Sequence, residues 1–296
     1  MTAPMTTPRT ATAVGPGYGG RTHARWRAGV RALGVAAVAL LLQAVLTPPA
    51  GAQGTGTGSM GGMKGMGMER TIRTFLLADV LEYQPNASDR PVSFEGLAWI
   101  GGDYRRVFLR AQGDVPTTGE GGEVQGDVLF GRLLTPFWTA VAGARVDSRV
   151  AGVHRVTGGA QAGDGGGRVT RGMLAVGLVG IAPFWLEMEP MLYVSQDGDV
   201  SAEFETAFDL LLTQRLIVQP RLELSAAVQR VPEFGVGSGL NDVEVGARLR
   251  YEIRRKFAPY VGVSWVRRTS GTAAMARGAG EPVSAGVVVA GVRMWR

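Results

Sequence analysis

The segment GSGLNDVEVGARLRYEIRRKFAPYVGVSWVR, at residues 237–267, alternates between two kinds of side chain. From Asp242 to Ile253, charged residues and one glycine occupy one set of alternate positions, and apolar residues with one tyrosine occupy the other. A period of two predicts a β-strand, because a helix repeats every 3.6 residues. One apolar face opposite a face with charges of both signs is typical of a strand between lipid and a polar lumen. The run is also long enough for a tilted membrane-spanning strand of roughly 9–11 residues.

From about residue 72 onward, the chain is a series of similar runs separated by Gly, Asp and Pro turns. We count about 12 runs, from 72–83 to 287–295, and an even number is typical of bacterial outer-membrane barrels. The first two runs alternate less cleanly than the others. Aromatic residues at the ends of runs suit interfacial girdles; these are Phe137, Trp138, Phe184, Trp185, Phe257, Tyr260 and Trp265. The sequence therefore predicts an all-β protein, an antiparallel transmembrane β-barrel over residues 71–296.

Composition supports this fold and excludes several functions. The 296 residues include 45 Gly and no Cys. Glycine suits tight turns and crowded strands better than helices, and the lack of Cys excludes disulfides and thiolate zinc sites. The net charge of +6 is concentrated in residues 1–52, which contain five Arg and no acid. Without them the charges nearly balance, and no basic stripe for nucleic acid is present.

The N-terminal region has the three parts of a secretory signal peptide. Arg25, Arg27 and Arg31 precede an apolar run from Leu33 to Leu46, and small residues follow at 50–52. The run is shorter than the ~20 residues that a transmembrane helix needs. We therefore expect residues 1–52 to direct export, with cleavage near Ala52. Because no other apolar run reaches that length, a membrane role must come from strands.

A short segment rich in glycine and methionine follows, at residues 53–70. Met60, Met63, Met66 and Met68 are separated almost only by Gly, so the segment should be flexible. Thioethers are soft ligands that suit Cu(I) or Ag(I) and not zinc or magnesium. The segment is thus a candidate copper site that favours Cu(I); the alternative is a low-complexity spacer whose methionines have no role.

The middle of the chain contains a second candidate site, made of carboxylates on the predicted lumen face. Two successive runs should bring five acids together; these are Glu187, Glu189, Glu203, Glu205 and Asp209. Unpaired carboxylates would repel each other, so either arginines or a bound cation must compensate their charge. Ion pairs that hold the wall together are the commoner arrangement in such barrels, and a lumen metal site is the alternative.

The chain offers little for catalysis. After removal of residues 1–52, the sequence contains one histidine, His154, in a Gly-rich stretch at 151–169. With no Cys and no evident partner for His154, a Ser–His or Cys–His site has few residues from which to form. We therefore do not expect an enzyme, and a membrane-embedded hydrolase is the disfavoured alternative.

Six segments of the chain together resemble one known family. They are FLLADVLEYQ (75–84), WIGGDYRRVFLRAQGD (99–114), IAPFWLEMEPMLYVS (181–195), FDLLLTQRLIVQPRLEL (208–224), GSGLNDVEVGARLRYEIRRKFAPYVGVSW (237–265) and AGVRMW (290–295). In this order they closely resemble the copper resistance protein B family, outer-membrane barrels of Gram-negative bacteria. The resemblance implies an outer-membrane protein that binds copper and sequesters or exports it. It also implies periplasmic copper-handling proteins and a multicopper oxidase as partners, besides lipid and copper.

Family members carry a Met-rich segment between signal peptide and barrel, so the resemblance implies copper binding at Met60, Met63, Met66 and Met68. This chain departs from the family in three ways. First, the segment is short and lacks His. Second, some lumen positions are occupied by apolar residues and a threonine. Third, Arg296 ends the chain in place of an aromatic residue. The lumen positions are Leu97, Thr139, Val141 and Val266. The alternative function is a general porin without metal specificity, although a barrel of about 12 strands is narrow enough to be filled by side chains.

Overall fold

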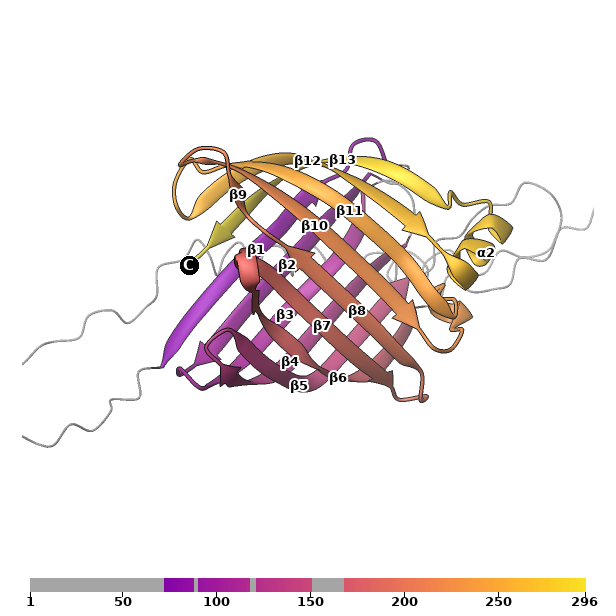
Figure 1. The fold of residues 1–296 in the computed structure, drawn as a ribbon. Coiled ribbons are helices and arrows are strands. Elements are labelled where there is room, and N and C mark those ends of the chain that lie inside the picture. Colours follow the sequence, from indigo (N-terminus) through magenta and orange to yellow (C-terminus); the bar gives the residue numbers. More distant parts are fainter. Residues whose placement is uncertain (1–71, 88–89, 118–120, 151–167) are drawn as a thin grey trace, which may run out of the picture.

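A computed structural model describes residues 72–87, 90–117, 121–150 and 168–296. The sequence forms a single antiparallel sheet that closes on itself into a barrel (Figure 1). The expected signal peptide, the methionine segment and His154 lie outside the described residues.

The strands follow the alternating runs of the sequence. Their bounds are β1 Arg73–Tyr83, β2 Pro91–Gly101, β3 Arg105–Pro116, β4 Gly122–Thr135, β5 Trp138–Val150, β6 Arg168–Ala182, β7 Leu186–Ser195, β8 Val200–Ala207, β9 Leu210–Leu211, β10 Leu216–Ala227, β11 Gly239–Tyr251, β12 Phe257–Arg268 and β13 Ser284–Trp295. Short 3-10 turns occur at η1 Pro183–Trp185 and η2 Pro232–Phe234, and a helix, labelled α2, spans Ser270–Gly278. Among the described residues, no helix has the length and apolar character to cross a membrane.

Each strand pairs with its sequence neighbour, and β1 pairs with both β2 and β13 to close the ring. The two-residue β9 pairs with β10, as β8 does, so it continues β8 after an interruption at residues 208–209. The 13 elements therefore form a barrel of 12 strands. Both the all-β class and the number of strands that the sequence predicted are confirmed.

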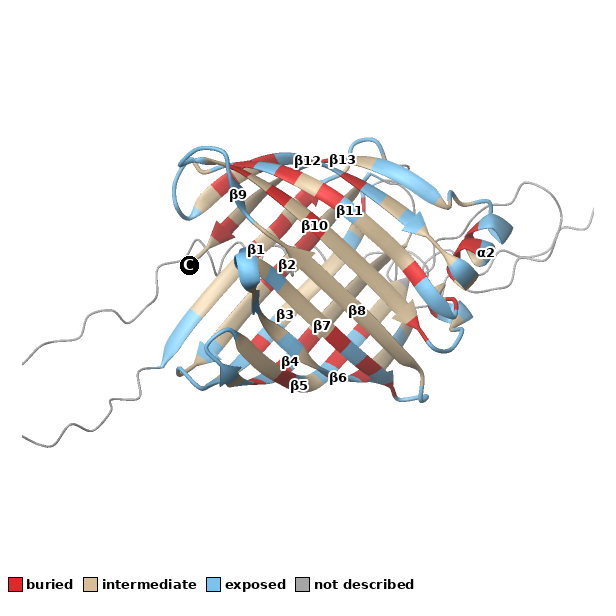
Figure 2. Cartoon of the chain, in the orientation of Figure 1, coloured by how far each residue is buried: buried red, intermediate tan, exposed pale blue. Residues whose placement is uncertain are grey.

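The two faces of β11 lie as the alternation predicts. Val245 and Tyr251 are each 47% exposed on the outside of the barrel, whereas Arg248 and Arg250 are 7% and 4% exposed inside it. Figure 2 shows buried residues alternating with intermediate or exposed ones along the neighbouring strands β10 and β12. One residue of the predicted aromatic girdle lies elsewhere, since Tyr260 is buried on the inner face.

The two ends of the barrel differ. At one, which we call the terminal end, β1 begins, β13 ends, and consecutive strands are joined by short connections such as residues 136–137 and 183–185. At the other, which we call the loop end, the connections are longer and include α2. The sequence did not predict this helix, which packs against β11 and β12.

Gly143 shows why the strands need glycine. It lies on β5 directly opposite Leu129 of β4. A Cβ atom at this position would lie 2.0 Å from the carbonyl oxygen of Val128 and 2.8 Å from the Cα of Leu129. Both are backbone atoms that cannot move without disturbing the sheet, so the close approach of the two strands requires glycine.

Candidate functional site

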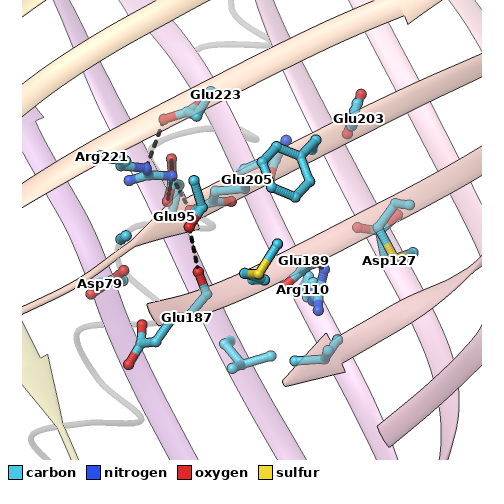
Figure 3. Close-up of a pocket in the computed structure, with 18 of the residues that line it drawn as sticks. Asp79, Glu95, Arg110, Asp127, Glu187, Glu189, Glu203, Glu205, Arg221 and Glu223 are labelled. Carbon is cyan, nitrogen blue, oxygen red and sulfur yellow. Dashed lines mark hydrogen bonds and ion pairs between the residues drawn. The ribbon is translucent and has the colours of Figure 1, made fainter. Parts of the chain in front are cut away.

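A cavity of about 530 Å³ occupies part of the barrel lumen (Figure 3). Ten carboxylates and three arginines line it, which gives the wall an excess of negative charge. The carboxylates belong to Asp79, Glu95, Asp127, Glu187, Glu189, Glu203, Glu205, Glu223, Asp242 and Glu244. The arginines are Arg110, Arg221 and Arg293.

Four of the five acids that the sequence singled out line this cavity. Glu187 and Glu189 come from β7, and Glu203 and Glu205 from β8. Glu189 lies directly opposite Glu205 in the register of these strands. Asp209 does not line the cavity. It follows β8, and its carboxylate contacts Arg250 at 2.5 Å and accepts a hydrogen bond from the Gln219 amide at 3.0 Å.

Arginines from other strands compensate four of these five charges. The four ion pairs are Glu189 with Arg110, Glu203 with Arg145 at 2.7 Å, Glu205 with Arg221 at 2.7 Å, and Asp209 with Arg250. Glu187 differs from the others. Its carboxylate forms no ion pair with any described residue, and its exposed side chain projects into the cavity while its backbone carbonyl accepts a hydrogen bond from Thr206 at 2.8 Å.

Arg221 is the centre of one charge cluster on the cavity wall. Its Nη2 atom lies 2.9 and 2.8 Å from the two carboxylate oxygens of Glu95. It also contacts Glu205 and, through Nε, Glu223, each at 2.7 Å. Because Glu95 lies on β2 and Arg221 on β10, separated by four strands around the ring, this ion pair crosses the lumen. The pair therefore divides the interior of the barrel.

Arg145 forms a second cluster, which is deeper in the wall. Its side chain is 1% exposed, with Nε 2.8 Å from Asp147 and 3.8 Å from Asp127. Its guanidinium also lies 4.4 Å from the ring centre of Tyr193, a cation–π contact. Asp147 in turn accepts two hydrogen bonds from Arg171, at 3.0 and 3.1 Å. This network joins β4, β5, β6, β7 and β8.

Apolar side chains fill the lumen beside the charged cavity. One cluster, from β3 to β7, consists of Phe108, Leu129, Val141, Met173, Ala175, Met191 and Tyr193. Leu97, Trp99 and Val179 pack against it. Three of the lumen positions that depart from the family are thus found inside, because Leu97 and Val266 line the cavity and Val141 belongs to this cluster. The interior is therefore partly packed, and the cavity occupies only part of it.

At the loop end, residues 228–238 fold back against the barrel. The Phe234 side chain is 7% exposed and lies under the guanidinium of Arg171, 4.2 Å from the ring centre. Arg149 donates a hydrogen bond to the Phe234 carbonyl. The Thr272 hydroxyl of α2 accepts a hydrogen bond from the backbone of Gly237 at 2.9 Å, so α2 supports the same segment. Phe234 is thus held by Arg149 of β5 and Arg171 of β6.

The pattern of the sequence did not assign Glu95, Arg221 and Arg145 to a site. Arg221 and Glu223 follow the alternation of β10, but Glu95 lies on β2, where Ser93, Glu95, Leu97 and Trp99 mix polar and apolar residues on one face. Across the described ranges, no three His, Cys, Asp or Glu side chains are grouped so as to hold a metal ion. The lumen metal site therefore stays a prediction, as does the site at Met60, Met63, Met66 and Met68.

Comparisons with known proteins cover nearly the whole barrel. A family model described as "Copper resistance protein B precursor (CopB)" matches residues 72–296. Two curated relatives, copper resistance protein B of Escherichia coli and a copper resistance protein B homolog of Pseudomonas syringae pv. tomato, are each 37% identical over 227 residues. Each alignment covers 77% of this chain and 71% of the relative.

Among solved structures, a KdgM porin aligns with a TM-score of 0.37 and 11% sequence identity, over 76% of this chain and 98% of the porin. A KdgM porin in complex with disordered oligogalacturonate aligns with a TM-score of 0.36. This likeness is weak and adds nothing to the argument about function.

Proposed function

The chain belongs to the copper resistance protein B family, and from this premise we propose that it binds copper ions at the outer membrane and sequesters or exports them. A copper resistance role follows from the family. Within the barrel, the observation that supports a role in attracting cations is the excess of carboxylates over arginines on the wall of the lumen cavity. A negatively charged cleft with low-dielectric walls raises the local concentration of cations.

The proposed orientation places the terminal end in the periplasm. Bacterial outer-membrane barrels have short periplasmic turns and longer extracellular loops, and the terminal end has the short turns. The segment at 53–70 would then begin the mature chain on the periplasmic side, after cleavage near Ala52. There it can meet periplasmic copper-handling proteins and a multicopper oxidase, the partners that the family implies.

We propose Met60, Met63, Met66 and Met68 as the main copper ligands. Methionine thioethers favour Cu(I), and the reduced, monovalent ion is the form expected on a segment without His or Cys. The lumen carboxylates are hard oxygen ligands, which suit Cu(I) less well. They therefore serve to attract a cation and not to retain it, and Glu187 is the one most available to do so.

The experiment measures Cu(I) binding to the refolded mature protein beside two variants. In the first, Met60, Met63, Met66 and Met68 are all changed to Leu, which keeps the apolar volume and removes the sulfur. In the second, Glu187→Gln and Glu244→Gln remove charge from the cavity and leave the methionines intact. We expect the methionine variant to lose binding and the carboxylate variant to keep it.

Two other outcomes contradict the proposal. If the methionine variant binds as tightly as the unmodified protein and the carboxylate variant does not, the site lies in the lumen and the segment at 53–70 is a spacer. If the unmodified protein does not bind Cu(I), copper is not a ligand of this chain. Conductance without cation preference would then indicate a general porin.

A further inference from the structure

Six basic residues stand exposed at the terminal end of the barrel, and none forms an ion pair with a described residue. We call them the basic rim: Arg105, Arg132, Arg215, Arg254, Arg255 and Lys256. The acids nearby are few. Asp103 lies 4.0 Å from Arg73, and Glu252 follows the end of β11. The terminal end, which carries the rim, is at the left of Figure 2.

Two members of the basic rim lie face to face. Arg105 on β3 is directly opposite Arg132 on β4, so both side chains leave the same face of the sheet. This is the outer face, because Val107 and Phe130, two residues along each strand, are exposed there. Like charges directly opposite on neighbouring strands are destabilising. The pair is thus better explained by an anionic partner outside the barrel than by the fold.

The other four members form a second group across the barrel. Arg254, Arg255 and Lys256 are consecutive in the turn between β11 and β12. Arg215 lies beside this turn, because its carbonyl accepts a hydrogen bond from the backbone of Glu252 at 2.8 Å. Four positive charges are therefore gathered at one part of the rim, with Glu252 as the neighbouring acid.

The loop end has no comparable excess among the residues that are described there. Its arginines are in part compensated, as Arg268 is by Glu281 at 2.5 Å and Arg171 by Asp147 at 3.0 Å. Exposed Asp197 and Glu233 lie in the loops of the same end. Arg90, Arg230, Arg267 and Arg277 are also exposed at the loop end without an ion pair to a described residue, but acids of the same end balance them, so the excess of basic charge is found at the terminal end.

Large apolar side chains accompany the basic rim. Phe184 and Trp185 are 94% and 79% exposed in the turn between β6 and β7, and Tyr104 and Phe137 are 74% and 63% exposed in nearby turns. Phe184 and Trp185 also adopt φ angles of 67° and 62°, which bulky residues rarely do. Exposed aromatic residues beside unpaired cations are typical of the boundary between hydrocarbon and headgroups.

We propose that the basic rim binds the anionic headgroups of phospholipids in the periplasmic leaflet. The inference rests on the orientation proposed above and not on copper binding. A lipid partner is favoured over an acidic protein because Arg105 and Arg132 continue the lipid-facing strips of β3 and β4. A headgroup phosphate beside these two arginines would remove their repulsion, while its acyl chains would lie along the apolar residues of the same face.

The test compares lipid binding by three forms of the mature protein in neutral detergent. The rim variant combines Arg105→Gln, Arg132→Gln, Arg254→Gln, Arg255→Gln and Lys256→Gln. The control removes exposed charge at the loop end with Arg230→Gln, Arg267→Gln and Arg277→Gln. Each form is titrated with phosphatidylglycerol or with phosphatidylcholine of the same acyl chains, and bound lipid is counted by native mass spectrometry. Circular dichroism verifies that each variant is folded.

We expect the unmodified protein and the control to bind phosphatidylglycerol roughly tenfold more tightly than phosphatidylcholine, because only the anionic headgroup carries a net charge opposite to that of the rim. The rim variant should bind the two lipids within about twofold of each other. In 0.5 M salt the Debye length is only a few ångströms, so the preference of the unmodified protein for phosphatidylglycerol should fall. If the full rim variant does not fold, Arg105→Gln alone replaces it, because it changes a single exposed side chain. This variant should lose part of the preference for phosphatidylglycerol.

The proposal is overturned if the rim variant keeps the preference for phosphatidylglycerol, or if the control loses as much of it as the rim variant does. In the first case an acidic periplasmic protein would be the favoured partner of the basic rim. Neither outcome depends on Cu(I) binding by residues 53–70, so failure here is distinguishable from failure of the proposed copper function.

Discussion

Replacing Arg221 with Ala tests whether the ion pair that crosses the lumen stabilises the barrel. The substitution leaves Glu95, Glu205 and Glu223 close together without the cation that they share. Removing one partner of a fully buried ion pair costs about 3–5 kcal/mol. Here the three carboxylate side chains are 31%, 43% and 35% exposed to the cavity, so water can solvate them. We therefore expect a loss of about 1–3 kcal/mol in the free energy of unfolding.

The assay is equilibrium unfolding in urea of the mature protein refolded into lipid vesicles, followed by tryptophan fluorescence. Arg230→Ala is the matched control, since it removes an exposed arginine of the loop end that forms no ion pair with any described residue. It should change the free energy of unfolding by no more than about 0.5 kcal/mol. Adding Glu95→Gln to Arg221→Ala removes one of the three repelling charges, so the double variant should be more stable than Arg221→Ala alone.

This expectation is refuted if Arg221→Ala and Arg230→Ala unfold at the same urea concentration. It is also refuted if Glu95→Gln lowers the stability of the Arg221→Ala barrel further. Either result would mean that water in the cavity screens these carboxylates completely. The ion pair between Arg221 and Glu95 would then not stabilise the contact between the two sides of the barrel.

Two further substitutions test the packing of the strands and the segment at the loop end. Gly143→Ala should lower the free energy of unfolding by about 1–3 kcal/mol in the same assay, because its Cβ would meet the backbone of β4. Gly286→Ala, at a position with open space around it, should be neutral. Equal urea midpoints for the two variants would contradict this prediction. Phe234→Ala removes the ring beneath Arg171, and loss of a cation–π contact should favour opening of residues 228–238 by roughly two- to thirtyfold. Single-channel conductance should then rise relative to Val228→Ala, an exposed control, and unchanged conductance would show that Phe234 does not restrict the lumen.

The strands were predictable because one physical constraint repeats along the chain. A wall with lipid outside and a polar lumen inside imposes a period of two, and β11 shows it clearly in Val245 and Arg248. The signal weakens where the lumen is itself apolar. On β2, Glu95 shares its face with Leu97 and Trp99, so alternation alone does not distinguish inside from outside, and no sequence pattern places Glu95 in a site.

Partners across the lumen were not predictable for a different reason. Glu189 and Glu205 meet through the register of neighbouring strands, which the hairpin pattern implies. Arg221 and Glu95 are 126 residues apart, and they meet because of the diameter of the closed barrel and the stagger of its strands. The helix α2 was missed because only nine residues form it, and its buried Ala273 and Ala276 are too few to make a recognisable apolar face.

The ion pairs also determine where a cation in the lumen would bind at the lowest cost. At Glu203 or Glu205 the cation must displace Arg145 or Arg221, and at Glu189 it must displace Arg110. Each displacement leaves an arginine without its carboxylate in a partly buried wall, which is destabilising. At Glu187 no described arginine has to move, and the side chain is exposed to the cavity. Because Glu187 lies near the start of β7, at the terminal end of the barrel, a cation that enters from the periplasm would meet this carboxylate before the ion pair of Arg221 and Glu95.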